Sequence, residues 1–209
     1  SAEQLPVAKR ALTLKKTRLA LKTSGQVNFV CRVGDYDKAG IEYNGAMRIL
    51  ANMMNSDYLW NNVRVKGGAY GCGAAFGSYS SSLGAFSSYR DPNLEKTNEI
   101  YDKAPEYVES FNADEREMTK YVIGTISDLD LPKTPSVKGS DSFEAYISGL
   151  TEQMLQKERD EVLDATVEDI RALSGMVKAV LDDGYFCVVG NEDKINEAKD
   201  MFDVIEPLA

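Results

Sequence analysis

Residues 64–71 read Arg-Val-Lys-Gly-Gly-Ala-Tyr-Gly and bring a guanidinium, a glycine pair and a phenol into one short segment. Guanidinium and phenol groups donate hydrogen bonds and suit the binding of a carbonyl oxygen or an oxyanion. The paired glycines let the backbone bend sharply or approach a ligand closely. The segment therefore predicts a substrate-binding site. Its residues are Arg64, Lys66, Gly67, Gly68 and Tyr70.

Each of these residues also has a purely structural explanation. Arg64 can complement the negative end of a helix, and Tyr70 can be an ordinary strand aromatic. Gly67 and Gly68 can form only a turn, and a lone lysine such as Lys66 is commonly solvated. The residues themselves leave both interpretations open.

The chain contains no histidine. Catalytic zinc usually takes histidine ligands, and serine or cysteine hydrolases usually need a histidine base. Neither site can be assembled in its ordinary form from this chain alone, and we expect no metal site in it. The chain is therefore expected to complete an active site whose other groups lie elsewhere.

Composition indicates a globular protein of 209 residues with 27% charged residues and a net charge of -9. The negative charge disfavours nucleic-acid binding. The longest apolar stretches fall short of the roughly 20 residues that a membrane-spanning helix needs, so we expect a soluble, cytoplasmic protein. Residues 1–24 carry six Lys or Arg and one Glu, and they are interpreted as a connecting segment before a single domain at residues 25–209.

Local periodicity predicts the elements that position the segment. Val27, Phe29, Cys31 and Val33 alternate with other residues, as in a strand. Apolar residues at helical spacing from 43 to 58 predict a helix that runs toward Trp60 and leaves Arg64 just beyond its end.

A hairpin should follow the turn. Residues 70, 72, 74 and 76 would lie on one face of its first strand, and Gly71, Gly73 and Gly77 on the other, where another backbone or a helix could approach. Residues 77–82 form the expected turn, and residues 83–89 the antiparallel partner.

The remaining segments read mainly as helices. Asp91-Pro92 should begin a helix that Pro105 kinks or splits, and Asn112 or Asp114 should cap the next one. The other expected elements are a loop at residues 131–139, a helix from Ser140 with Phe143, Tyr146, Ile147, Leu150 and Met154 inward, a helix from Thr166, a strand at residues 185–189 and a helix capped by Asn191. This order predicts an α+β fold with one mainly antiparallel sheet that several helices cover on one face.

The chain from about Gly25 onward resembles the C-terminal half of a pitrilysin/insulinase-type, or inverzincin, zinc metallopeptidase, most closely in the presequence protease branch. The resemblance rests on residues 64–71 and the hairpin after them, on Arg90-Asp91-Pro92, and on Ser142-Phe143 through Gly149 and Leu163. Its sharpest motif is the arginine followed six positions later by a tyrosine around the Gly-Gly turn. It implies a metallopeptidase fold of the LuxS/MPP-like type.

The resemblance also implies a function. In this family the zinc is held by an inverted His-x-x-Glu-His motif in the N-terminal half, which this chain lacks. The chain would be the C-terminal domain, inactive alone, whose partners are the N-terminal half of the same polypeptide and an unfolded peptide enclosed between the halves. Tyr70 and Arg64 would be the catalytic residues, with Tyr70 donating to the oxyanion and Arg64 binding a substrate carbonyl.

Two other classes of function remain to be compared with this one. A nucleotide-binding loop would need the glycines to follow a strand and open a helix, whereas here a helix is expected before them and a strand after them. A catalytically inactive scaffold module of the same fold is the main alternative.

Overall fold

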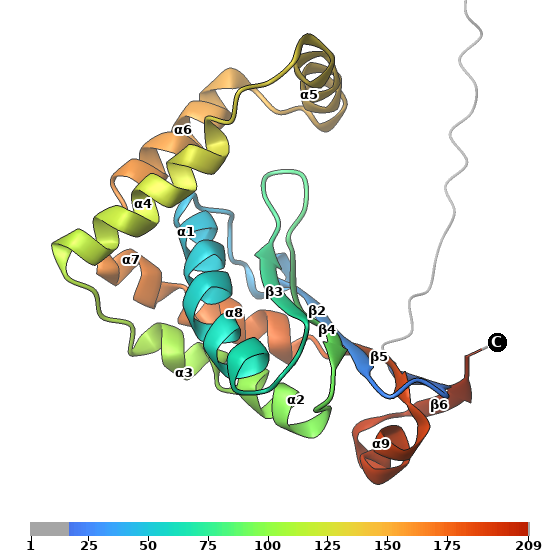
Figure 1. Cartoon of the computed structure of the whole chain (residues 1–209). Coiled ribbons are helices and arrows are strands. Elements are labelled where there is room, and N and C mark those ends of the chain that lie inside the picture. Colours follow the sequence, from blue (N-terminus) through green and yellow to red (C-terminus); the bar gives the residue numbers. More distant parts are fainter. Residues whose placement is uncertain (1–16, 209) are drawn as a thin grey trace, which may run out of the picture.

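The computed structural model describes residues 17–208, which form a sheet with helices packed on one face (Figure 1). The six strands of this part of the chain are β1 (Arg18–Thr23), β2 (Asn28–Asp35), β3 (Gly71–Phe76), β4 (Leu83–Asp91), β5 (Tyr185–Asn191) and β6 (Val204–Pro207). Their order is β3-β4-β2-β5-β1-β6. The α+β class is confirmed.

The sheet is mixed. The four strands β3, β4, β2 and β5 pair antiparallel, as predicted, but β1 pairs parallel with both β5 and β6. The sequence analysis placed Arg18–Thr23 in a connecting segment, whereas these residues form β1 inside the sheet. The strand was not predicted because its apolar part is only residues 19–21, with Ala20 buried, and the basic residues Arg18 and Lys22 lie on either side of it. Residues 1–16 of that segment lie outside the described residues.

The helices surround the sheet on one side. They are α1 (Ala46–Met53), α2 (Glu95–Asp102), α3 (Ala104–Glu109), α4 (Glu115–Leu129), α5 (Pro135–Ser148), α6 (Glu152–Leu163), α7 (Val167–Ala172), α8 (Ser174–Asp182) and α9 (Glu192–Glu197). Two 3₁₀ turns, η1 (Tyr36–Ala39) and η4 (Lys199–Met201), and two π-helical stretches, η2 (Met54–Tyr58) and η3 (Trp60–Val65), complete them. None of these elements packs over the opposite face of the sheet in Figure 1.

Helix α8 packs closely on the sheet at two glycines. A Cβ atom at Gly34 would lie 2.0 Å from the Val180 carbonyl oxygen, and one at Gly84 would lie 2.5 Å from the Val180 side chain. Gly34 and Gly84 are register partners in β2 and β4. A backbone or a helix was expected to approach Gly71, Gly73 and Gly77. The helix instead approaches Gly34 and Gly84, and only at Gly77 does another backbone come close, since a Cβ there would lie 2.0 Å from the Ser81 carbonyl oxygen.

Several predicted helix boundaries are confirmed. Asp114 and Thr166 each form a capping box with an acidic residue three positions later, and Asn191 caps α9 through the Lys194 amide. The predicted split near Pro105 separates α2 from α3. Asp91 is different, because it ends β4 and α2 begins only at Glu95 without a side-chain cap.

The region around α5 differs most from the sequence analysis. Pro135 opens α5 within the expected loop, because proline suits the first turn of a helix and Thr134 provides the cap. The helix ends at Gly149, in the left-handed conformation, and α6 starts separately after Thr151. Phe143, Tyr146 and Ile147 were expected inward, but all three are exposed. The periodic apolar face exists, but α5 contains no buried residue among those described.

A buried carboxylate ties α6 to α1. Glu158 is 3% exposed and accepts hydrogen bonds from the Arg48 Nε, at 2.6 Å, and from the Tyr43 hydroxyl. We expect Arg48→Ala to lower the free energy of unfolding by about 2 to 3 kcal/mol, because it leaves this carboxylate without its cation. The value lies below that of a fully buried pair since the Arg48 side chain is 41% exposed.

Urea unfolding followed by circular dichroism measures this change. The matched control is Arg159→Ala, which removes the cation of the exposed pair with Asp130 and should cost less than about 1 kcal/mol. Equal losses in the two variants would contradict the role of the buried Glu158.

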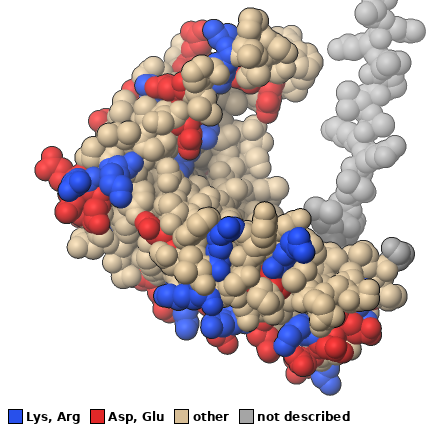
Figure 2. Space-filling model, in the orientation of Figure 1, with Lys and Arg blue, Asp and Glu red and all other residues tan. Residues whose placement is uncertain are grey.

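Charged side chains gather along the helices, and the surface over the β3–β4 hairpin is formed mainly by other residues (Figure 2). Among the described residues, none of the helices has both the length and the apolar character needed to span a membrane.

Candidate functional site

The helix that carries Arg64 is longer than predicted. After α1 the chain continues through η2 and η3 to Val65, held by inward residues such as Leu59 and Val63, which are fully buried. The Lys66 amide donates to the Asn61 carbonyl at 3.0 Å, the wide spacing of a π-helix. Arg64 therefore lies in the last turn of this helix and not beyond its end.

The glycine pair forms the turn that follows. Gly68 has a φ of 81°, in the left-handed region that favours glycine. A Cβ at Gly67 would lie 2.4 Å from the Val63 carbonyl oxygen, so the backbone there is packed directly on the helix end. Asn93, after β4, donates a hydrogen bond to the Gly67 carbonyl and fixes the turn from the other side.

The structure brings Arg64 and Tyr70 together. The Arg64 guanidinium donates to the backbone carbonyl of Tyr70, and its central carbon lies 4.5 Å from the Trp60 ring centroid and 5.6 Å from that of Tyr70. The guanidinium is thus held between two aromatic rings, an arrangement that favours cation–π contact. This internal hydrogen bond joins the end of the helix to the residue before β3.

Lys66 is not part of this pair. Its ammonium donates to the Asn62 side-chain oxygen at 3.3 Å, on the preceding turn, and it forms no hydrogen bond with Arg64 or Tyr70 within residues 17–208. Its proposed substrate contact stays a prediction.

Tyr70 is 65% exposed and lies just before β3 begins. Its amide donates to the Tyr89 carbonyl at 3.1 Å, and its ring centroid is 5.9 Å from that of Tyr89. Tyr89 lies on the open face of the sheet, whereas residues 72, 74 and 76 pack toward the helices. The prediction that Tyr70 shares their face is wrong, because the strand alternation starts only at Gly71. Within residues 17–208 the Tyr70 hydroxyl has no hydrogen-bond partner.

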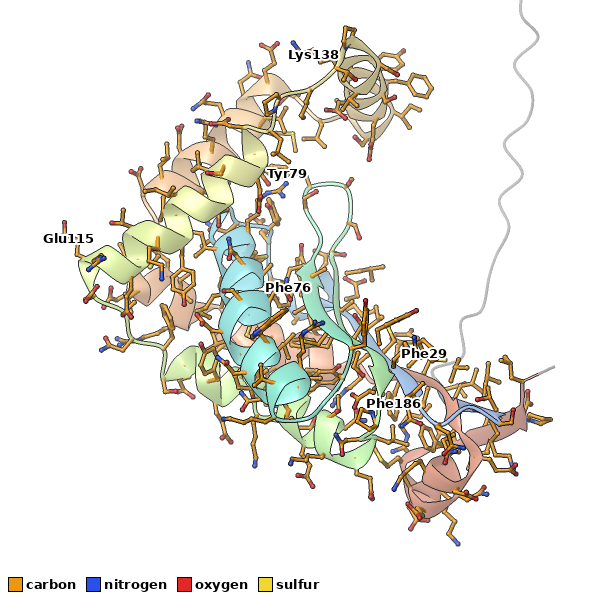
Figure 3. The ribbon with its side chains drawn as sticks, viewed as in Figure 1. Phe29, Phe76, Tyr79, Glu115, Lys138 and Phe186 are labelled. Atoms are coloured by element: carbon orange, nitrogen blue, oxygen red, sulfur yellow. The ribbon has the colours of Figure 1, made fainter. Side chains whose placement is uncertain are left out.

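Three aromatic residues of this site were missed by the sequence analysis. Trp60 precedes Arg64 by four positions on the same helix, a spacing that brings side chains together and could have revealed it. Phe29 and Tyr89 come from two different strands, and their ring centroids are 5.1 Å apart in an edge-on contact. Figure 3 shows Phe29 on the side of the sheet away from α1.

The backbone beside Tyr89 is irregular. The register of β2 against β4 shifts between Asn28 and Val30, which marks a β-bulge, and Arg90 has a φ of 50°. Such a conformation is unfavourable for a residue with a side chain and persists where its surroundings impose it. Buried Asp91 is one constraint, since it accepts from the Asn93 amide and the Thr97 hydroxyl, at 2.8 and 2.7 Å.

Within the described residues, no group of three or more Cys, Asp or Glu side chains is arranged to hold a metal ion. The three cysteines have free thiols and are half-buried, and burial raises their pKa values above the ordinary range.

Comparisons with known proteins place these features in context. Residues 18–192 match the family described as the PreP C-terminal domain. The chain is 46% identical over 196 residues to Protein HypA of Clostridium perfringens and 34% identical over 203 residues to Presequence protease 1, chloroplastic/mitochondrial, of Arabidopsis thaliana. These matches include 93% and 94% of this chain but only 20% and 18% of the two relatives. The chain thus spans about a fifth of their length.

Solved structures share the fold. A protease from Helicobacter pylori aligns with a TM-score of 0.63 at 16% identity, covering 90% of this chain and 48% of that one. The peptidase M16 inactive domain from Pseudomonas fluorescens aligns with a TM-score of 0.58 at 14% identity, covering 97% and 46%.

Proposed function

Because the chain belongs to the PreP C-terminal domain family, we propose that it is the C-terminal, non-zinc-binding domain of a zinc metalloendopeptidase that degrades unfolded oligopeptides. The observation that supports this most directly is that half-buried Arg64 lies beside exposed Tyr70 at the rim of the open sheet face. The described residues do not fit a zinc site. Zinc, which would supply the hydrolytic chemistry, is therefore assigned to the N-terminal half of the same polypeptide.

Arg64 would bind a backbone carbonyl of the peptide. In this structure its guanidinium already donates to a backbone carbonyl, that of Tyr70, and two aromatic rings hold it in place. A substrate carbonyl would meet the same planar set of donors. This contact would orient the peptide next to the phenol of Tyr70.

Tyr70 would donate its phenol hydrogen to the oxyanion that develops at the scissile carbonyl. Its hydroxyl is free of partners among the described residues, so it can be aimed at a substrate. Removing one such donor typically costs about 3 to 4 kcal/mol of transition-state stabilisation. Since the zinc would lie in the other half, catalysis would need the two halves to close around the peptide, a gating role seen in other enzymes with lids.

The proposal is tested by the peptidase activity of the longer polypeptide, which would contain both the zinc-binding N-terminal half and this chain. We expect it to cleave a quenched unfolded peptide, to lose that activity with a zinc chelator and to regain it with added zinc, whereas the 209-residue chain alone should be inactive. A longer polypeptide that stays inactive with added zinc would support the alternative, a scaffold module. A cytoplasmic location stays a prediction, while the Arabidopsis relative is named as chloroplastic/mitochondrial.

A further inference from the structure

The open face of the sheet carries no charged residue over the central part of its four antiparallel strands; Asp35, at the end of β2, and Lys38, over the Tyr185 ring, lie at the end of the face away from Phe29. The outward positions between Phe29 and Val33, Gly71 and Ala75, Leu83 and Tyr89, and Tyr185 and Val189 are apolar, small or uncharged polar residues. An antiparallel sheet that faces water usually alternates apolar and polar residues. In a chain with 27% charged residues, this face is therefore suited to contact with another molecule.

A continuous row of side chains crosses from the helix end onto this face. It consists of Trp60, Arg64, Tyr70, Tyr89 and Phe29, and we call it the aromatic row. Each neighbouring pair is in ring or cation–π contact. The four aromatic side chains are 46%, 65%, 51% and 39% exposed in that order along the row, so all four offer ring surface to a ligand.

A strip of small residues lies beside the aromatic row. Gly71 is the register partner of Tyr89, Gly73 that of Ser87, and Ala75 that of Ala85. A strip without large side chains lets another backbone approach the sheet closely. The exposed rings beside this strip of small residues leave room for the backbone of an extended peptide.

The edge of the sheet is closed to a peptide at its centre. β3 is the edge strand, and the Asn55 side chain donates to the Ala74 carbonyl at 2.9 Å and accepts from the Ala74 amide at 2.6 Å. It thus occupies the backbone groups that an added strand would need. An extended peptide would have to lie over the face and not along this edge.

A second copy of the chain fits this face less well than a peptide does. Each copy carries a net charge of -9, and two such bodies repel. A short peptide need not carry such a charge, and the aromatic row includes Arg64 and Tyr70, the pair proposed above to bind a peptide.

We propose that Phe29 and Tyr89 form a subsite for a bulky apolar or aromatic side chain of the bound peptide. This inference rests on the proposed function, since it continues the site of Arg64 and Tyr70. The centroids of Tyr70, Tyr89 and Phe29 are spaced by 5.9 and 5.1 Å, which together span at most about three residues of an extended chain. The preferred side chain therefore lies within about three residues of the carbonyl next to Tyr70.

Two unfolded peptides of equal length test the subsite. They differ only at the position within about three residues of the carbonyl next to Tyr70, where one carries phenylalanine and the other alanine. Binding to the 209-residue chain is followed by the fluorescence of Trp60, its single tryptophan. We expect the phenylalanine peptide to bind about tenfold more tightly, and this preference to disappear in Phe29→Ala and in Tyr89→Ala. Phe143→Ala, which removes a more exposed ring on α5, outside the aromatic row, should keep the preference.

Circular dichroism identifies a variant that has not folded. If Phe29→Ala does not fold, Phe29→Leu replaces it, and because leucine keeps an apolar side chain this variant should retain part of the preference for the phenylalanine peptide. An unchanged preference in Phe29→Ala and Tyr89→Ala would overturn the proposal. So would sedimentation that finds the unliganded chain dimeric and Phe29→Ala monomeric, because the face would then join two copies. Turnover of the alanine peptide by the longer polypeptide tests the proposed peptidase separately, so the two failures can be distinguished.

Discussion

Tyr70→Phe in the longer polypeptide is expected to lower turnover of an unfolded peptide by about a hundred- to a thousandfold. The substitution removes only the hydroxyl, which has no partner within residues 17–208 and is proposed to donate to the developing oxyanion. The ring contact with Tyr89 at 5.9 Å should survive, so the stability of the domain should not change. Steady-state kinetics with a quenched peptide measure the effect, and the zinc content should equal that of the wild type.

A second tyrosine provides the matched control. Tyr146 on α5 is 85% exposed and lies outside the aromatic row, so Tyr146→Phe should leave turnover within about twofold of the wild-type value. Wild-type turnover in Tyr70→Phe would show that the phenol is an ordinary strand-end aromatic. A fall in zinc content would instead show that the variant acts through the fold.

Gly67→Ala should have the second largest effect, although it adds only one methyl group. The new Cβ would lie 2.4 Å from the Val63 carbonyl oxygen, and because that atom belongs to a helix backbone the turn itself must move. A shift of about 1 Å in a catalytic group can cost about a hundredfold in rate, and we expect a loss of this size in turnover. The free energy of unfolding should fall by about 1 to 3 kcal/mol.

The control for this variant is Gly139→Ala. Gly139 lies in exposed α5, where an added Cβ meets nothing within 4 Å, so alanine should stabilise the domain by up to about 1 kcal/mol and leave turnover unchanged. Kinetics and thermal melts of both variants separate the two causes. Full activity in Gly67→Ala would mean that the position of the turn does not set the geometry of Arg64 and Tyr70.

The exposed apolar face of α5 illustrates the limit of periodicity. The spacing of Phe143, Tyr146 and Ile147 correctly indicated a helix, because apolar residues at intervals of three and four share one side. The same spacing could not show what covers that side. That depends on where the neighbouring elements pack, and in this part of the structure they leave the face exposed.

The sequence alone determined the features that depend on neighbouring residues. Caps at Asp114, Thr166 and Asn191, the hairpin of β3 and β4, and the Gly67-Gly68 turn each follow from backbone chemistry within a few positions. The short distance in sequence between Arg64 and Tyr70 likewise allowed them to be predicted as one site.

The tertiary structure decided what depends on segments far apart in the chain. The parallel pairing of β1 with β5 joins residues more than 160 positions apart, and the aromatic row takes Phe29 from β2 and Tyr89 from β4. No local pattern marks such contacts, because they form only when burial of the opposite face of each strand fixes its register. That register turns Phe29 and Tyr89 outward beside Tyr70, and so it extends the pair of Arg64 and Tyr70 into the larger surface that we propose binds a peptide.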